Sequence, residues 1–133
     1  MHGICALCQD ETNLKESHLI PKFVGKWLKR TSATGYLRDI DNINKRQQDI
    51  PKEYLLCHNC EILFSGWEKL FAEQIFLPSL DKELYISSYN EWLSKFCASR
   101  SWRTLISIKR QNNGFNDESD YFLKQTKKLT ITF

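Results

Sequence analysis

The sequence has no apolar run close to the roughly 20 residues that span a bilayer. Its longest runs, such as residues 54–57 and 75–77, are much shorter than that. Residues 1–5 show no basic stretch followed by an apolar one, so no secretory signal is visible. We therefore expect a cytoplasmic protein with no membrane association and no stable disulfides.

The sequence also lacks internal repeats and low-complexity tracts, and its composition excludes a disordered chain. Of its 133 residues, 41% are hydrophobic and 26% are charged, close to the average of globular proteins. This length suits one domain that buries about two-thirds of the surface of the unfolded chain. We predict a single domain over residues 1–133, with an α+β, mainly helical fold.

Four of the five cysteines form two Cys-x-x-Cys pairs, Cys5 with Cys8 and Cys57 with Cys60. A two-residue spacer lets two thiolates on one tight turn reach the same ion, and four such ligands suit tetrahedral zinc. Redox-active pairs or buried thiols are alternatives, but two independent redox motifs are not expected in so short a chain. We predict that all four cysteines bind a structural Zn²⁺. Cys97 lies in an apolar helical stretch and is expected to be buried.

A short strand is predicted from Leu14 to Leu19 and carries His18. Pro21 then suits the first turn of a helix. The apolar residues of this helix recur at helical spacing and are Ile20, Phe23, Val24, Trp27 and Leu28. Its opposite face has no acid and carries Lys22, Lys26, Lys29 and Arg30. This basic face is directed either to solvent or to a nucleic-acid backbone.

Further along, the polar residues 31–52 predict a long loop. A helix is predicted over residues 61–74, limited by Pro78. A third helix is predicted from Tyr89 to about Arg110, and a last short helix over residues 117–128 before the strand-like residues 129–133.

The net charge of +3 is unevenly distributed along the chain. Residues 15–52 hold nine Lys and Arg against four Asp and Glu, whereas residues 53–91 hold two against seven. Residues 95–110 hold five basic residues and no acid. Basic segments of this kind either bind phosphates or form solvated faces.

Three sequence blocks, in a fixed order, carry a family resemblance. They are Cys5-x-x-Cys8, Ser17-His18-Leu19-Ile20-Pro21 and Leu55-Leu56-Cys57-x-x-Cys60-Glu61. This order resembles zinc-stapled members of the HNH endonuclease family, also called the ββα-metal or His-metal finger group. In that family a cysteine knuckle precedes an acidic-His-x-x-Pro segment, and a Leu-Cys-x-x-Cys-His segment begins the catalytic helix. The resemblance covers residues 4–65 and implies a ββα-metal core within residues 1–77, extended by a helical part over residues 78–133.

The resemblance implies that His18 is the general base, which takes a proton from the water that attacks a phosphodiester. It also implies a catalytic Mg²⁺ or Mn²⁺ beside the scissile phosphate. Glu61 stands where the family usually has its metal-binding histidine, and a carboxylate is a good oxygen ligand for either ion.

Two positions depart from the family pattern. Ser17 replaces the acidic residue that commonly precedes the general base, and Lys52 stands where the family has its middle asparagine. A serine hydroxyl is a much poorer metal ligand than a carboxylate, so one metal ligand is missing. Glu68, on the same predicted helical face as Glu61, is a candidate second carboxylate.

The same residues also have purely structural interpretations. His18 would then hydrogen-bond a carbonyl at the end of its strand, and Glu61 would be an N-terminal acid favoured by the helix dipole. His58, between two zinc ligands, is expected to be exposed. On this basis a catalytically inactive zinc-binding adaptor for nucleic acid or a protein partner is the alternative function, and a structural subunit that docks a partner is a third.

The leading prediction is an HNH-like metal-dependent endonuclease that hydrolyses phosphodiester bonds of DNA, with RNA less favoured. A bacterial defence or mobile-element system is a suitable setting. The predicted catalytic residues are His18 and Glu61, the predicted DNA contacts are Lys22, Lys26, Lys29 and Arg30, and the predicted zinc ligands are Cys5, Cys8, Cys57 and Cys60.

Overall fold

The computed structural model describes residues 1–39, 41–47, 51–80, 90–111 and 116–131, and its strands lie in the first half of the chain. These strands are β1 (His2–Ile4), β2 (Glu11–His18), β3 (Leu37–Arg38), β4 (Arg46–Gln47) and β5 (Lys52–Cys57). Strands β1, β2 and β5 form one antiparallel sheet in that order, and β3 pairs with β4 separately. The predicted long loop therefore contains two short strands, and β2 is longer than predicted.

A β-bulge in the pairing of β2 with β5 buries three consecutive residues. The bulge lies between Lys15 and Glu16 of β2, and Leu55 is the extra residue of β5. An extra residue interrupts the alternation of side chains between the two faces of a strand. Leu55, Leu56 and Cys57 are consequently all buried, so the end of β5 carries its cysteine into the interior.

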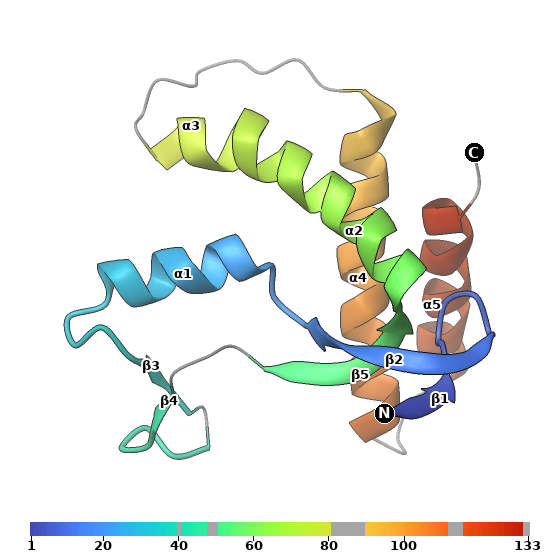
Figure 1. Ribbon diagram of the computed structural model, residues 1–133, viewed down its shortest axis with the longest axis horizontal. Helices are drawn as coiled ribbons and strands as arrows, with labels where there is room; N and C mark the ends of the chain where they lie inside the picture. Colours follow the sequence, from blue (N-terminus) through green and yellow to red (C-terminus); the bar gives the residue numbers. More distant parts are fainter. Residues whose placement is uncertain (40, 48–50, 81–89, 112–115, 132–133) are drawn as a thin grey trace.

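Helices make up most of the described residues. They are α1 (Lys22–Thr31), α2 (His58–Phe71), the π-helix η1 (Ala72–Phe76), α3 (Leu77–Leu80), α4 (Glu91–Gln111) and α5 (Asp117–Ile131). The predicted α+β, mainly helical fold is confirmed, although Tyr89, the predicted start of the third helix, lies outside the described residues. Figure 1 shows α2, η1 and α3 as a nearly continuous rod beside α1, with α4 and α5 next to each other. Among the described helices, none combines the length and apolar character that a bilayer-spanning segment needs.

The prediction that Pro78 limits the second helix is wrong. Helix α2 continues through η1 into α3, which contains Pro78. In a π turn the hydrogen bonds span five residues, as between the Leu77 N–H and the Ala72 carbonyl. In a regular helix the proline ring clashes with the carbonyl four residues before it, and the wider turn changes that spacing.

The strand expected over residues 129–133 is wrong where the structure describes it, because this part belongs to α5. Residues 132–133 lie outside the described residues. Thr130 is fully buried, and its hydroxyl donates to a carbonyl one turn earlier in the helix (2.8 Å). Nζ of Lys95, in α4, donates to the carbonyl of Leu129 (2.8 Å). Packing against α4 therefore outweighs the strand preference of this short segment.

A hydrophobic core joins the sheet to α2, α4 and α5. Phe64 and Trp102 lie at its centre, 0% and 1% exposed, with ring centroids 5.9 Å apart in an edge-to-face arrangement. Leu123 of α5 belongs to the same core. Helix α4 buries a wide face because α2 and α5 both pack on it. Cys97, which we expected to be buried, is on the exposed side of α4.

Replacing Phe64 tests this core. We expect Phe64→Ala to lower the free energy of unfolding by about 3–5 kcal/mol, because it leaves a cavity beside Trp102. Phe122→Ala is the matched control, since Phe122 is 52% exposed, and it should change stability by about 0.5 kcal/mol or less. Urea denaturation followed by tryptophan fluorescence measures both. Equal effects of the two substitutions would contradict this description of the core.

Candidate functional site

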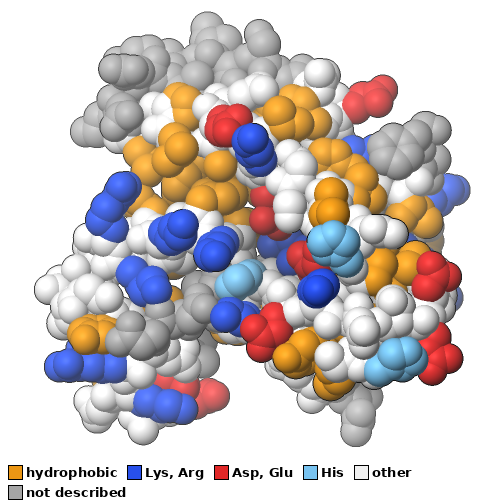
Figure 2. Space-filling model, in the orientation of Figure 1, with side chains coloured by type: hydrophobic (Ala, Val, Ile, Leu, Met, Phe, Trp, Pro, Cys, Tyr) orange, Lys and Arg blue, Asp and Glu red, His pale blue; other side chains and the backbone are white. Residues whose placement is uncertain are grey.

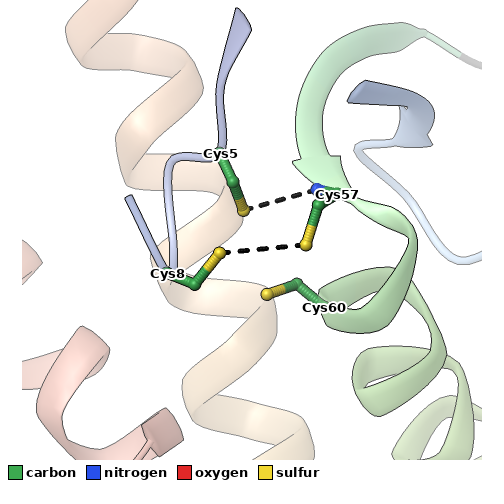
Figure 3. A group of neighbouring side chains, drawn as sticks. All are labelled: Cys5, Cys8, Cys57 and Cys60. Atoms are coloured by element: carbon green, nitrogen blue, oxygen red, sulfur yellow. Dashed lines mark hydrogen bonds between the residues drawn. The ribbon is translucent and has the colours of Figure 1, made fainter. Parts of the chain in front are cut away.

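The four cysteines of the two Cys-x-x-Cys pairs form one cluster. Their Sγ atoms all lie within 4.8 Å of one another, and Sγ of Cys8 is 3.8 Å from Sγ of Cys57. Figure 3 shows the four sulfur atoms pointing toward a shared centre. In a tetrahedral site with Zn–S bonds of about 2.3 Å, neighbouring sulfurs are about 3.8 Å apart. The donor set and its spacing therefore fit zinc.

Two tight local structures place these thiols. Between Cys5 and Cys8 the chain turns back, with the Gln9 N–H donating to the Cys5 carbonyl (2.9 Å) and Gln9 itself in the left-handed region (φ 68°). On the other side, Cys57 ends β5 and Cys60 lies in the first turn of α2. The Cys57 N–H donates to Sγ of Cys5 (3.3 Å), which links the two turns directly.

The thiols differ in how readily they lose their protons. Burial raises the pKa of Cys5, but backbone N–H groups, of which that of Cys57 acts most strongly, outweigh it and lower the pKa to about 7. The pKa of Cys8 is raised to about 11: the Asp10 backbone lowers it, but burial and contacts with Cys5 and Cys57 raise it more. The pKa of Cys60 is raised mainly by burial. A bound dication stabilises all four thiolates together, as structural zinc does.

Strand β2 and helix α2 meet beside the four-cysteine cluster. Leu14, in the middle of β2, pairs with Cys57 at the end of β5. Further along β2, the fully buried Ser17 donates its hydroxyl to Oε1 of Glu61. The segment with the predicted general base and the helix with the predicted metal ligand therefore meet in space. His18 is half-buried, and its Nε2 atom is shielded from solvent.

Two arginines of α4, which were not predicted as site residues, also lie where β2 meets α2. Nη2 of Arg103 lies 3.7 Å from Oε1 of Glu61, and Nη2 of Arg100 lies 2.7 Å from Oε1 of Glu68. The other ends of the two guanidinium groups hold the end of β2. Arg103 donates to the His18 carbonyl (2.8 Å), and Arg100 donates to the next carbonyl along the chain (3.2 Å).

Both guanidinium groups are buried and remain charged at neutral pH. The side chains of Arg103 and Arg100 are 2% and 15% exposed. Burial lowers the pKa of Arg100 to about 10, the nearby Arg103 contributes to the lowering, and Glu68 and Glu61 oppose it. Burial also lowers the pKa of Arg103, against the effect of the same carboxylates. The Phe64 ring lies under Arg103, with its centroid 5.0 Å from Cζ.

A sequence signal for this cluster exists. Arg100 and Arg103 are three residues apart and share a helical face in a segment without acids, and Glu61 and Glu68 share a face of an acidic segment. Complementary charges at matching spacings on two helices indicate an interface between them. The sequence alone does not show that α2 packs on α4, so the pattern identifies this interface only together with the structure.

The residues near Glu61 do not fit a bound Mg²⁺ or Mn²⁺. Magnesium needs about six oxygen ligands in near-octahedral geometry, usually including one or two carboxylates that are free to bind it. Here Oε1 of Glu61 already accepts the Ser17 hydroxyl and faces Arg103, while Glu68 is paired with Arg100. Within the described ranges, the four cysteines are the only group of three or more His, Cys, Asp or Glu side chains placed to hold a metal.

The predicted nucleic-acid contacts lie on α1. Lys22, Lys26 and Arg30 are exposed, and no described carboxylate pairs with them. Lys29 is half-buried and interacts within the protein. Figure 2 shows basic side chains gathered over α1, with hydrophobic ones beside them toward α3. There a pocket of about 210 Å³ is lined by Phe23, Lys26, Trp27, Arg30, Phe76 and Leu77.

The basic residues of the second basic segment, residues 95–110, contact other elements of the protein. Besides Arg100 and Arg103, its basic residues bind neighbouring elements: Lys95 the Leu129 carbonyl, Lys109 the Asp120 carboxylate (2.6 Å) and Arg110 the Tyr54 carbonyl (3.1 Å). These charges therefore fix α4 against the sheet and α5. Helix α1, in the first basic segment, differs because Lys22, Lys26 and Arg30 are exposed and pair with no described carboxylate.

The structure also places His58 and Lys52, two residues considered in the sequence. His58 is exposed, as predicted, between Cys57 and Cys60. Lys52 stands where the HNH pattern has its middle asparagine, and its Nζ lies 3.8 Å from Oε2 of Glu16 on the neighbouring strand.

No protein-family model, curated protein or solved structure matches this chain.

Zinc content tests the four-cysteine cluster directly. We expect the purified protein to bind one Zn²⁺ per chain, and Cys60→Ser to lose it together with the near-ultraviolet circular dichroism of the folded core. Cys97→Ser is the matched control, since Cys97 is exposed and outside the cluster. Removal of the ion with a chelator should unfold the wild-type protein, because structural zinc contributes about 10–16 kcal/mol to such sites. Retention of zinc and fold by Cys60→Ser would contradict the site.

Proposed function

We propose that this protein is an HNH-like endonuclease domain that binds DNA along α1 and cleaves it at the end of β2. The observation that supports this most is the meeting of Ser17 with Glu61 next to the four-cysteine cluster. Three sequence blocks that resemble one family thereby come together in space. Two antiparallel strands, β2 and β5, followed directly by α2, are consistent with a ββα-metal core.

In the proposed reaction His18 is the general base. Its imidazole takes a proton from a water molecule whose oxygen forms the new bond to phosphorus. The P–O bond to the leaving nucleotide breaks, and the leaving oxygen takes a proton from solvent. The expected catalytic Mg²⁺ or Mn²⁺ has no place in this proposal, because Glu61 and Glu68 are already held by arginines.

The DNA contacts follow from the exposed charge of α1. Lys22, Lys26 and Arg30 lie on a single helix, so they can follow one phosphate backbone without reading bases. The pocket between α1 and α3 adds Phe23 and Trp27 at its wall. Their rings offer apolar surface next to the basic side chains, which suits a nucleotide at the edge of the bound strand.

A zinc-binding adaptor without catalytic activity is the second candidate. It is favoured by the shielding of Nε2 of His18 and by the pairing of Glu61 with Ser17 and Arg103. Such an adaptor would keep the DNA-binding surface of α1. Cleavage assays therefore separate the two functions, and binding assays do not.

The test of catalysis is His18→Ala. If His18 is the general base, this substitution should slow cleavage of duplex DNA about 100- to 10,000-fold without changing zinc content or DNA affinity. His2→Ala is the control, because His2 lies at the far edge of the sheet, paired with Glu11. Wild-type protein that binds DNA and never cleaves it would leave the adaptor function in place of the nuclease.

The test of binding is a triple variant, Lys22→Ala with Lys26→Ala and Arg30→Ala. We expect weaker DNA binding and a smaller slope of log affinity against log salt, by about 0.9 for each lost phosphate contact. Lys124→Ala is the control, since Lys124 is exposed on α5 and pairs with Asp120. Fluorescence anisotropy over a range of salt concentrations measures both. An unchanged slope in the triple variant would mean that α1 is not the DNA-binding surface.

A further inference from the structure

The charges around the end of β2 balance without any added ion. Glu61 and Glu68 contribute two negative charges, and Arg100 and Arg103 contribute two positive ones. All four side chains are at least four-fifths buried. A divalent cation at the same carboxylates would leave a surplus of positive charge in a poorly solvated site, which is strongly unfavourable.

The two arginines also connect several elements of the fold, as a bound metal ion would. A metal ligated from several elements fixes their relative positions. Here Arg103 bridges the His18 carbonyl and the Glu61 carboxylate, and Arg100 bridges the Leu19 carbonyl and the Glu68 carboxylate. Each guanidinium group thus joins the end of β2 to α2 from a third element, α4. Arginine suits this role because its planar group has five donors in a fixed geometry.

We propose that Arg103 and Arg100 take the place of the catalytic divalent cation in this protein, so that its only resident metal is the ion of the four-cysteine cluster. This inference rests on the proposed function for the identity of the site, but its main test does not need activity. The two arginines are positioning residues: they neutralise the carboxylates and hold the strand that carries His18.

The replacement of the family's acidic residue by Ser17 is consistent with this inference. A carboxylate at that position would add a third negative charge near Glu61, as a metal site requires. The Ser17 hydroxyl instead donates a hydrogen bond to Glu61 and carries no charge. With Ser17, the number of carboxylates matches the number of buried arginines.

The test measures Mn²⁺ binding to the zinc-loaded protein by electron paramagnetic resonance. We expect Mn²⁺ affinity to be the same in the wild type and in Glu61→Gln, because Glu61 is not available to the ion. A loss of affinity of about tenfold or more in Glu61→Gln would show that Glu61 is a metal ligand and would overturn the proposal.

A second variant tests the arginine directly. Arg103→Met removes one buried cation while keeping an unbranched side chain, so we expect Mn²⁺ to bind about tenfold more tightly than in the wild type. This gain should disappear when Glu61→Gln is added. Zinc content and near-ultraviolet circular dichroism show whether Arg103→Met folds; if it does not, the comparison of the wild type with Glu61→Gln decides. A folded Arg103→Met that gains no Mn²⁺ affinity would contradict the proposal.

Cleavage assays then separate this inference from the proposed function. We expect zinc-loaded wild-type protein to cleave DNA equally well in metal-depleted buffer and after addition of Mg²⁺. Cleavage that requires Mg²⁺ or Mn²⁺ and is lost in Glu61→Gln would overturn the arginine proposal and support the nuclease. Absence of cleavage in both buffers, with Mn²⁺ affinity unaffected by Glu61→Gln, would reject the nuclease and support the arginine pair as the resident cations.

Discussion

The four-cysteine cluster is the constraint on which the rest of this structure depends. A chain of this length has a net stability of about 5–15 kcal/mol, and a structural zinc site contributes a similar amount. The cluster joins a turn at residues 5–8 to the junction of β5 and α2. The pairing of β2 with β5 holds the same two parts of the chain together. Together, the cluster and the sheet place the strand that carries Ser17 and His18 beside the helix that carries Glu61.

The basic residues of α1 and of α4 have different roles. Arg100 and Arg103 of α4 are buried, where they lie beside carboxylates and donate to carbonyls at the end of β2. The basic residues of α1 that make no ion pair with described carboxylates are directed outward. The same residue types therefore serve stability in one helix and are available to a phosphate backbone in the other. Charge counts along the sequence cannot distinguish these two uses, because both segments have an excess of basic residues.

At the end of β2, two residues depart from the pattern of the family proposed above. Two expected metal-binding features are altered, Ser17 in place of an acid and Glu61 in place of a histidine. Both altered residues contact each other, and Arg103 lies beside them. A buried carboxylate requires a compensating cation, and the fold supplies that cation from the helical part after residue 78. The second half of the chain is thus part of the site and of the core.

Local sequence determined the two cysteine pairs of the cluster, the basic face of α1 and most of the helices, because each depends on residues close together in the chain. Two Cys-x-x-Cys pairs specify a tetrahedral site wherever they meet, and helical spacing of apolar residues specifies a face. Only the tertiary structure showed that Pro78 lies within a helix, that Thr130 belongs to α5 and that Cys97 is exposed. The reason is that a π turn and the packing around α4 outweigh local preference. Tertiary structure also decided the role of Arg100 and Arg103. Their partners lie more than 30 residues away in the sequence, and only the packing of α4 on α2 brings these opposite charges within reach in a buried place where they must pair.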